Sequence, residues 1–344
     1  MARPKRRSNV IAIAAAFLIG ACGGSSPAPT TPSAPPTTPT TPTTPTNRWS
    51  VAGSVVDTVS RSPIAAAVVT PSWNLPPVSS GSDGAYSLGA PQNPPTGPYD
   101  ITVSADGFMT RKLWVNWQSG ARTGVTLDLI RNAPPFSMEF YRQFVRGTFD
   151  QADGPWALLR LPSAPTFYVK TVDQDGRPVE PEVISVVLDG IHRAVPAYSG
   201  GRYSAAIETG AAMRAEQSGW INVNIVRRPE DDDVCGLAFV GRTAGEITLN
   251  SDVCSCGSLK IPGHVVMHEV GHALGFFHVD DSRSVMYPTL PGRCPAGELS
   301  AAEQYHAAIA YSRPRGNTDP DDDPSSGALS MPGGAVARGI RVRN

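Results

Sequence analysis

The chain has 344 residues and a formal net charge of −1, from 29 Lys and Arg against 30 Asp and Glu. A balance this even excludes the broad electrostatic attraction by which basic proteins bind nucleic acids or anionic membrane surfaces, so we expect no nucleic-acid partner. The length favours two domains, and the 34 prolines and 33 glycines favour linkers and β-rich structure over a helical bundle.

Residues 1–22 are predicted to be an export signal that stands outside the fold. A basic start is followed by an apolar run at 10–21, which is too short to span a hydrocarbon core of ~30 Å as a helix. The run ends in Ile-Gly-Ala before Cys22 and resembles a bacterial lipobox. That resemblance implies lipidation of Cys22, and hence a membrane anchor at the cell surface or outer membrane. A simple secretory signal with an incidental cysteine is the alternative, and both imply export.

Residues 23–47 are rich in proline and threonine, which predicts a linker. Such a composition cannot bury a core, and extended polyproline conformations of ~3.1 Å per residue would give it a reach on the order of 75 Å. We interpret this segment as a stalk that separates the folded part from the membrane.

Residues 48–131 predict an all-β sandwich. Short alternating runs are separated by turn signals such as Asp83-Gly84 and Asp106-Gly107. The expected strands are 49–56, 65–70, 85–88, 99–104, 110–117 and 124–129. These elements resemble the carboxypeptidase regulatory-like family, which implies a transthyretin-like sandwich. Because the segment has no His or Cys, we interpret it as a spacer or adhesion module, with its tryptophans in the core rather than at a carbohydrate site.

Two further segments follow the sandwich. Residues 132–153 form a connector with a partly helical apolar pattern, which is either a docking helix or a remnant propeptide. Residues 154–313 are expected to form the second folded domain, with strands at 166–172, 220–226, 236–241 and 246–250. Helices are expected at 179–194, from Pro262 onward, and from 301 to 312, where Ser300 and Glu303 make a capping box.

The chemistry of the chain is concentrated in residues 268–278. His268 and His272 are four residues apart, so a helix places both imidazoles on one face, roughly 6 Å apart, where they can bind one ion. Gly275 can take a left-handed conformation that ends the helix, after which His278 arrives as a third nitrogen ligand. Three protein ligands leave one position for water, as in catalytic zinc sites. Glu269 is placed to take a proton from that water and pass it to a leaving amine.

This pattern, followed by Met286, resembles the metzincin metalloproteases, whose signature is HExxHxxGxxH and a Met-turn. The eight residues from His278 to Met286, and the Met-Tyr-Pro that begins there, are most similar to the matrixin branch. The resemblance implies an α+β domain that binds one catalytic Zn²⁺, with Met286 in a structural turn beneath the ion and Tyr287 outside the ligand set. It also implies a protein or peptide substrate, which would add as an extra strand beside residues 236–241.

We therefore expect an exported, lipid-anchored zinc endopeptidase with an N-terminal sandwich module. Two alternatives stay open. A non-catalytic surface adhesion protein would keep zinc for stability, although zinc binding alone would not require Glu269. A zinc amidase would use the same ligands to act on cell-wall peptides.

The other histidines and the acidic runs are weaker candidates for metal binding. His264 lies one helical turn before His268 and is the one competitor as a ligand or a residue lining the site. His192 and His306 are expected to be structural. The acidic residues 231–233 and 280–281 could supply oxygens to Ca²⁺, but solvated loops explain them as well.

The four cysteines after the signal are Cys235, Cys254, Cys256 and Cys294, an even set that favours disulfides in an exported chain. Neighbours two apart rarely pair, so two connectivities stay open: Cys235–Cys254 with Cys256–Cys294, or Cys235–Cys256 with Cys254–Cys294. A second zinc held by the four thiolates is the alternative. The polar composition of residues 314–344 predicts a disordered tail.

Overall fold

The computed structural model describes residues 49–73, 75–90, 97–117, 121–152, 155–228, 234–253, 260–289, 297–324 and 340–342. The predicted signal and linker lie outside these ranges, and so do Cys22, Cys254, Cys256 and Cys294. Lipidation of Cys22 and the disulfide connectivity therefore stay predictions. In the described part of the chain, no helix has both the length and the apolar character needed to cross a membrane.

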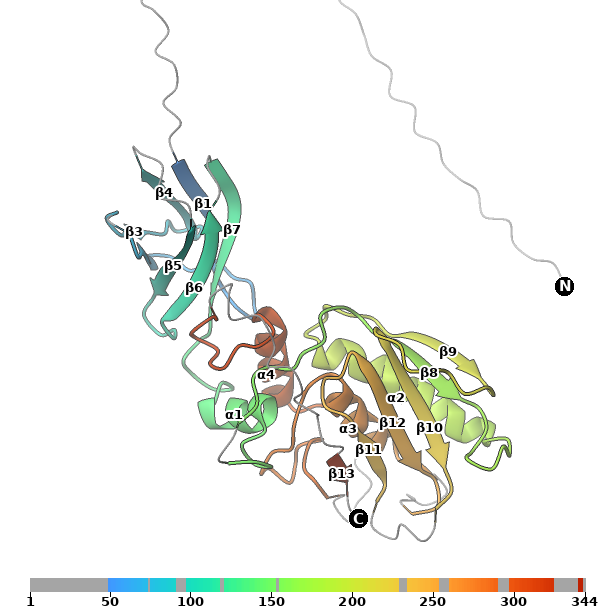
Figure 1. Cartoon of the computed structure of the whole chain (residues 1–344). Coiled ribbons are helices and arrows are strands. Elements are labelled where there is room, and N and C mark those ends of the chain that lie inside the picture. Colours follow the sequence, from blue (N-terminus) through green and yellow to red (C-terminus); the bar gives the residue numbers. More distant parts are fainter. Residues whose placement is uncertain are drawn as a thin grey trace, which may run out of the picture. The chain divides into compact units, whose positions relative to one another are not determined.

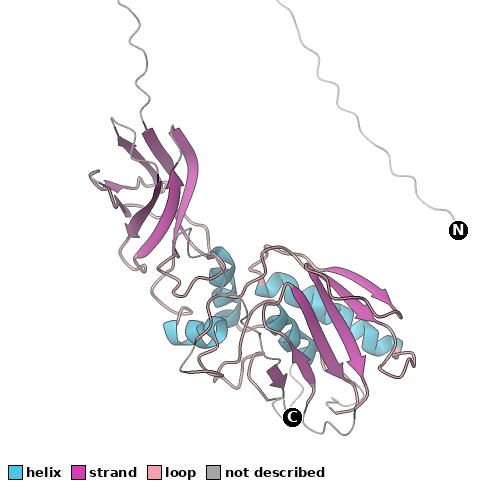
Figure 2. Cartoon of the chain, viewed as in Figure 1, coloured by secondary structure: helices cyan, strands magenta, loops and turns pink. Residues whose placement is uncertain are grey.

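The first folded part is a sandwich of two small sheets, with strand orders β4-β1-β7 and β3-β2-β5-β6 (Figures 1 and 2). Its strands are β1 Trp49–Asp57, β2 Val68–Pro71, β3 Val78–Ser79, β4 Ala85–Ala90, β5 Gly97–Ser104, β6 Arg111–Trp117 and β7 Ala121–Leu129. Alternate residues of both sheets, among them Val55, Ile101 and Leu127, meet in one apolar core. The alternating pattern predicted six of these strands. It missed β3, because two residues are too few to alternate.

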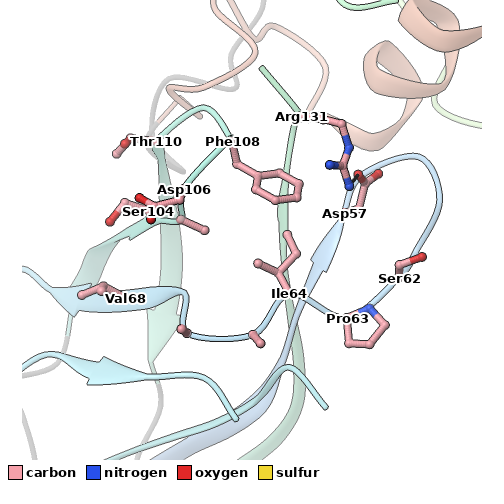
Figure 3. Close-up of a pocket in the computed structure, with 13 residues that line it drawn as sticks. Asp57, Ser62, Pro63, Ile64, Val68, Ser104, Asp106, Phe108, Thr110 and Arg131 are labelled. Atoms are coloured by element: carbon pink, nitrogen blue, oxygen red, sulfur yellow. Dashed lines mark ion pairs between the residues drawn. The ribbon is translucent and has the colours of Figure 1, made fainter. Parts of the chain in front are cut away.

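A cavity of about 700 Å³ opens on this sandwich (Figure 3). Arg131 lies 3.4 Å from a carboxylate oxygen of Asp57 and stands 4.8 Å from the centre of the Phe108 ring on its wall. Trp73 does not line this cavity; it packs against the sandwich core, with its ring 4.7 Å from that of Tyr99. Trp73 is only partly buried, so its placement in the core stays a prediction.

The connector contains the helix α1, Met138–Arg146. The Ser137 hydroxyl accepts a hydrogen bond from Phe140 N and begins the helix, and Gly147, with φ of 67°, ends it in the left-handed conformation. Tyr141, Phe144 and Val145 are buried on one side of the helix and belong to the core of the second folded part. The helical part of the connector is thus docked on this core.

The second folded part is built on a six-stranded sheet with the order β13-β11-β12-β10-β8-β9 (Figure 1). Its strands are β8 Thr166–Lys170, β9 Ala206–Gly210, β10 Trp220–Val226, β11 Gly236–Ala238, β12 Ala244–Asn250 and β13 Ile340–Val342. The strands β8, β9, β10 and β12 are parallel, whereas β11 runs antiparallel to both β12 and β13. The sequence missed β9, since four of its five residues are polar, glycine or alanine and none is fully buried.

Three helices complete this part: α2 Pro181–Tyr198, α3 Gly263–Ala273 and α4 Ala301–Ser312. The helices α2 and α3 lie together on one face of the sheet (Figure 1) and approach so closely that a side chain at Gly190 would strike Val266. The predicted capping box of α4 is present, because Ser300 and Glu303 each bond the other's backbone. The described chain is therefore rich in mixed sheet and has four helices.

The structure corrects the prediction that the chain is disordered from residue 314 onward. Residues up to 324 pair with the sandwich: Lys112 N donates to Asp321 O at 2.8 Å, and Asp323 N donates to Lys112 O at 2.9 Å. The β13 strand also lies in this tail. This polar segment also supplies a partner for a buried arginine, because Asp323 contacts Arg111 at 2.7 Å.

A group of buried charges surrounds that contact; we call Arg111, Asp128, Arg313 and Asp323 the charge network. Asp128 bonds Arg111 at 2.6 Å through one oxygen and Arg313 at 2.6 Å through the other. The Arg313 side chain is fully buried and that of Arg111 is 6% exposed. The network joins strands of the sandwich to the segment that follows α4.

Candidate metal centre

The three predicted ligand histidines meet at one point. His268 and His272 lie on α3, one turn apart, and the chain then reverses at Gly275, whose φ is 107°. Gly275 N donates to His272 O, and Phe276 N donates to Gly271 O, which closes the helix end. This reversal brings back His278, so that one ring nitrogen of each histidine lies within 4.8 Å of the others. In the described residues this is the one group of His, Cys, Asp and Glu with such spacing.

Each ligand imidazole is oriented by a hydrogen bond at its Nδ1 atom. His268 Nδ1 lies 2.7 Å from Val285 O, His272 Nδ1 lies 2.7 Å from Phe276 O, and His278 Nδ1 lies 2.7 Å from Asp150 Oδ1. Because these partners are acceptors, each Nδ1 carries the proton and each Nε2 keeps its lone pair. This leaves three Nε2 lone pairs as the nitrogens for an ion.

The arrangement of these lone pairs fits a bound cation. His268 Nε2 and His272 Nε2 are 2.9 Å apart, and two lone pairs at that distance repel unless a positive ion lies beside both. His278 Nε2 is buried without a hydrogen-bond partner in the described chain. Burial lowers the pKa of His268 well below its usual value and that of His272 to about 3, so both rings are neutral, as metal binding requires.

Glu269 lies on the same helix and is fully buried. Both of its carboxylate oxygens lack a hydrogen-bond partner among the described residues, and burial raises the pKa of this carboxyl well above 4.5. Its side chain lies against Gly236 of β11, where a Cβ atom would strike it. A buried carboxylate without a partner lowers the stability of the fold. A bound cation would compensate its negative charge, and a water on that cation would give it a hydrogen bond.

The predicted turn at Met286 lies against the middle of α3. Met286 is fully buried, and a side chain at Gly271 would strike both its sulfur and the ring of Tyr198. Val279 N donates to Met286 O at 3.1 Å, which ties the segment that carries His278 to the turn. Glu303 of α4 fixes the turn from the other side, because its Oε1 accepts from the Ser284 hydroxyl at 2.5 Å. The second role of Glu303, beyond its capping box, was not predicted.

Sequence reasoning also missed Asp150, which lies in the connector after α1. No motif marks it, and 128 residues separate it from His278. Only the folded chain brings the two together.

The remaining candidates lie outside the ligand cluster. His264 is buried on α3, but neither of its ring nitrogens has a partner in the described chain, and it does not join the three ligands. His306 bonds Ala302 O at 2.7 Å and Ser137 at 3.0 Å, as a structural histidine should.

Asp281 bonds the guanidinium of Arg283 at 3.0 and 3.1 Å, which accounts for its charge without calcium. Cys235 is buried, and the acidic residues 231–233 lie outside the described residues.

Comparison with known proteins gives one family match. Residues 260–307, which contain α3, the turn at Met286 and half of α4, match the matrixin family. No curated protein matches the chain.

Two solved structures resemble parts of the chain at 19% sequence identity. A DUF3823 family protein from Parabacteroides merdae has a TM-score of 0.19, over 24% of this chain and 46% of that one. A putative membrane-associated protein of unknown function from Bacteroides fragilis has a TM-score of 0.20, over 43% of this chain and 40% of that one. The chain thus spans less than half the length of either structure.

Proposed function

We propose that this protein is a zinc endopeptidase of the metzincin type, which hydrolyses peptide bonds. The observation that carries the proposal is the meeting of three unprotonated Nε2 atoms beside the unpartnered carboxylate of Glu269. The matrixin match over residues 260–307 supports a zinc peptidase, and the buried turn at Met286 supports the metzincin type. We further propose that the six-stranded sheet with α2, α3 and α4 is the α+β peptidase domain.

The chain's own residues have separate tasks in this chemistry. His268, His272 and His278 would hold the ion through Nε2, and their Nδ1 bonds keep the rings from turning. A zinc ion held there would supply a Lewis acid for the scissile carbonyl and would lower the pKa of a bound water towards ~7. The carboxylate of Glu269 accepts the proton of the attacking water and then delivers it to the nitrogen of the leaving amine. The burial of Glu269 favours this role, because both of its carboxylate oxygens are left without a partner among the described residues and are available to a bound water.

A peptide substrate was expected to add as a strand beside residues 236–241. The strand β11 is shorter than that, and its outer edge pairs with β13, with Gly236 opposite Val342 and Ala238 opposite Ile340. A peptide that joins this edge would therefore have to replace β13.

Export and lipidation at Cys22 remain part of the proposal. They rest on the basic start, the apolar run and the lipobox-like residues of the sequence.

The variant Glu269→Gln tests the mechanism. It keeps the size of the side chain but removes the base, so we expect peptide hydrolysis to fall by about 10²–10⁴-fold while zinc remains bound. Cleavage of a fluorogenic peptide library and the zinc content per chain would be measured together. Glu182→Gln, on the exposed first turn of α2, is the matched control and should cleave as the wild type does.

A Glu269→Gln protein that cleaves as fast as the wild type would rule out this mechanism. A wild-type protein that binds zinc fully and cleaves no peptide would favour the adhesion alternative. Release of fragments from peptidoglycan, but not from proteins, would favour the amidase.

A further inference from the structure

The third ligand is held differently from the other two. His268 and His272 project from a helix, whereas His278 lies in the irregular segment after it, which we call the third-ligand loop (residues 276–280). A loop has no helical hydrogen bonds of its own to fix a ligand. The geometry of His278 must therefore come from what packs against this loop.

The connector supplies that support. Phe277 N donates to Phe144 O at 2.8 Å, and Asp280 N donates to Oε1 of Gln143 at 2.9 Å. The rings of Phe144 and Phe276 stack, with their centres 4.4 Å apart. Both ends of the third-ligand loop are thus bonded to the last turn of α1. These contacts cross the domain boundary expected at residue 154.

Asp150 completes this support at the ligand itself. Its Oδ1 accepts from His278 Nδ1 at 2.7 Å, and its Oδ2 lies 3.3 Å from the backbone nitrogen of the same residue. One carboxylate therefore accepts hydrogen bonds from both the ring and the main chain of His278. The His278 side chain is 4% exposed and that of Asp150 is 29% exposed, so water competes little at the ring.

We propose that Asp150 is a positioning residue of the metal centre, which sets the proton on Nδ1 of His278 and aims its Nε2 at the ion. The other two ligands use neutral backbone carbonyls for this purpose, so His278 alone among the three has a carboxylate behind it. A carboxylate both fixes the ring and makes it a stronger ligand. The described part of the connector, residues 132–152, is accordingly part of the metal centre and not a removable propeptide. This inference rests on the proposed zinc site, but not on catalysis at it.

The test is the zinc affinity of the full-length chain, measured by competition with a chromogenic chelator. For Asp150→Ala we expect the dissociation constant to rise by about 10–100-fold, the usual effect of removing such a partner from a ligand histidine. Asp150→Asn keeps the size but loses the charge and should weaken zinc binding less. Asp150→Glu restores the carboxylate and should recover part of the loss. Glu139→Gln, an equal charge change on the exposed first turn of α1, is the control and should bind as the wild type does.

Two further readings separate positioning from folding. Thermal unfolding of each variant in excess chelator should match that of the metal-free wild type within a few degrees. The visible absorption of Co²⁺-loaded Asp150→Asn should differ from that of the Co²⁺-loaded wild type, because the geometry of one ligand has changed. Zinc affinity for Asp150→Ala and Asp150→Asn within twofold of the wild type would overturn the inference. A protein that shows the expected zinc affinities but cleaves no peptide would instead overturn the proposed function and leave this inference standing.

Discussion

At the scale of single residues, four histidines near one helix have very different surroundings. The three ligands each bond an acceptor through Nδ1, and their Nε2 atoms face one another. His264, one turn earlier on α3, is equally buried, but neither ring nitrogen has a partner among the described residues. Burial lowers the pKa of His264 to about 4, so the folded protein keeps this ring neutral. A buried imidazole without a partner makes the stability of the folded protein depend on pH.

We predict that His264→Leu makes the metal-free protein more resistant to mild acid. The pKa of His264 is about 4 when folded and ~6.5 when unfolded, so the unfolded chain takes up a proton first as the pH falls. The free energy of unfolding of the wild type therefore falls as the pH drops from ~6.5 to ~4. At pH 5 this one group lowers it by about 2 kcal/mol.

Denaturant unfolding at pH 7.5 and pH 5, with chelator present, measures this difference. The variant should lose about 2 kcal/mol less than the wild type between the two pH values. Equal losses in wild type and His264→Leu would show that His264 is not the titrating group.

At the scale of elements, the approach of β11 to α3 shapes the site. Gly236 in β11 lies so close to Glu269 that any side chain there would strike the carboxylate. This contact places β11 directly beside Glu269, the proposed general base. The glycine is required for space and not for backbone conformation, since its φ is not positive.

Gly236→Ala is therefore expected to slow peptide cleavage by roughly 10-fold or more, because the added methyl group displaces the base from its position. Zinc affinity should stay near the wild-type value, since the three ligands are untouched. Steady-state cleavage and zinc competition would be measured on the same preparation. Gly89→Ala in β4, where a Cβ atom meets nothing within 4 Å, is the matched control. Unchanged cleavage by Gly236→Ala would mean that Glu269 can move without loss.

The elements also show why part of this site could be predicted from the sequence. His268, Glu269 and His272 are fixed by helical spacing, and Gly275 by the reversal after the helix, so their arrangement is a local property of eleven residues. Asp150 could not be predicted, because its position depends on how α1 docks 128 residues away from His278. The same limit applies to the strand β13, whose partner β11 lies about a hundred residues earlier. The spacing of residues along the chain predicts local geometry, whereas contacts between distant residues produce no recognisable spacing in the sequence.

At the scale of the whole molecule, the charge network holds distant segments together. Desolvation acts to raise the pKa of Asp128, but the neighbouring Arg313 and Arg111 outweigh it and hold that pKa well below the usual range. The fully buried Arg313 also donates through Nε to Pro320 O. Two buried guanidinium groups thus share one carboxylate, and removing one partner of a buried ion pair leaves an uncompensated charge.

Asp128→Asn is expected to destabilise the protein by about 3–5 kcal/mol at pH 7, because it leaves two buried arginines without their shared partner. Since the pKa of Asp128 is depressed in the folded state, its contribution is present above pH ~4 and is lost as the pH falls further. The difference between variant and wild type should therefore shrink below pH 4. Asp100→Asn removes only a half-exposed contact to Lys112 at 3.9 Å and should cost less than ~1 kcal/mol. Similar unfolding free energies for the two variants would contradict a central role for the network.

The charge network also sets an order of events during folding. Asp128 precedes its partner Arg313 by 185 residues. An exported chain folds after it has crossed the membrane, so the timing that matters is the order of folding and not the order of synthesis. The pairing of Asp128 with Arg313 can form only once the end of α4 has reached the sandwich. The N-terminal module is therefore completed by a segment that lies near the other end of the sequence.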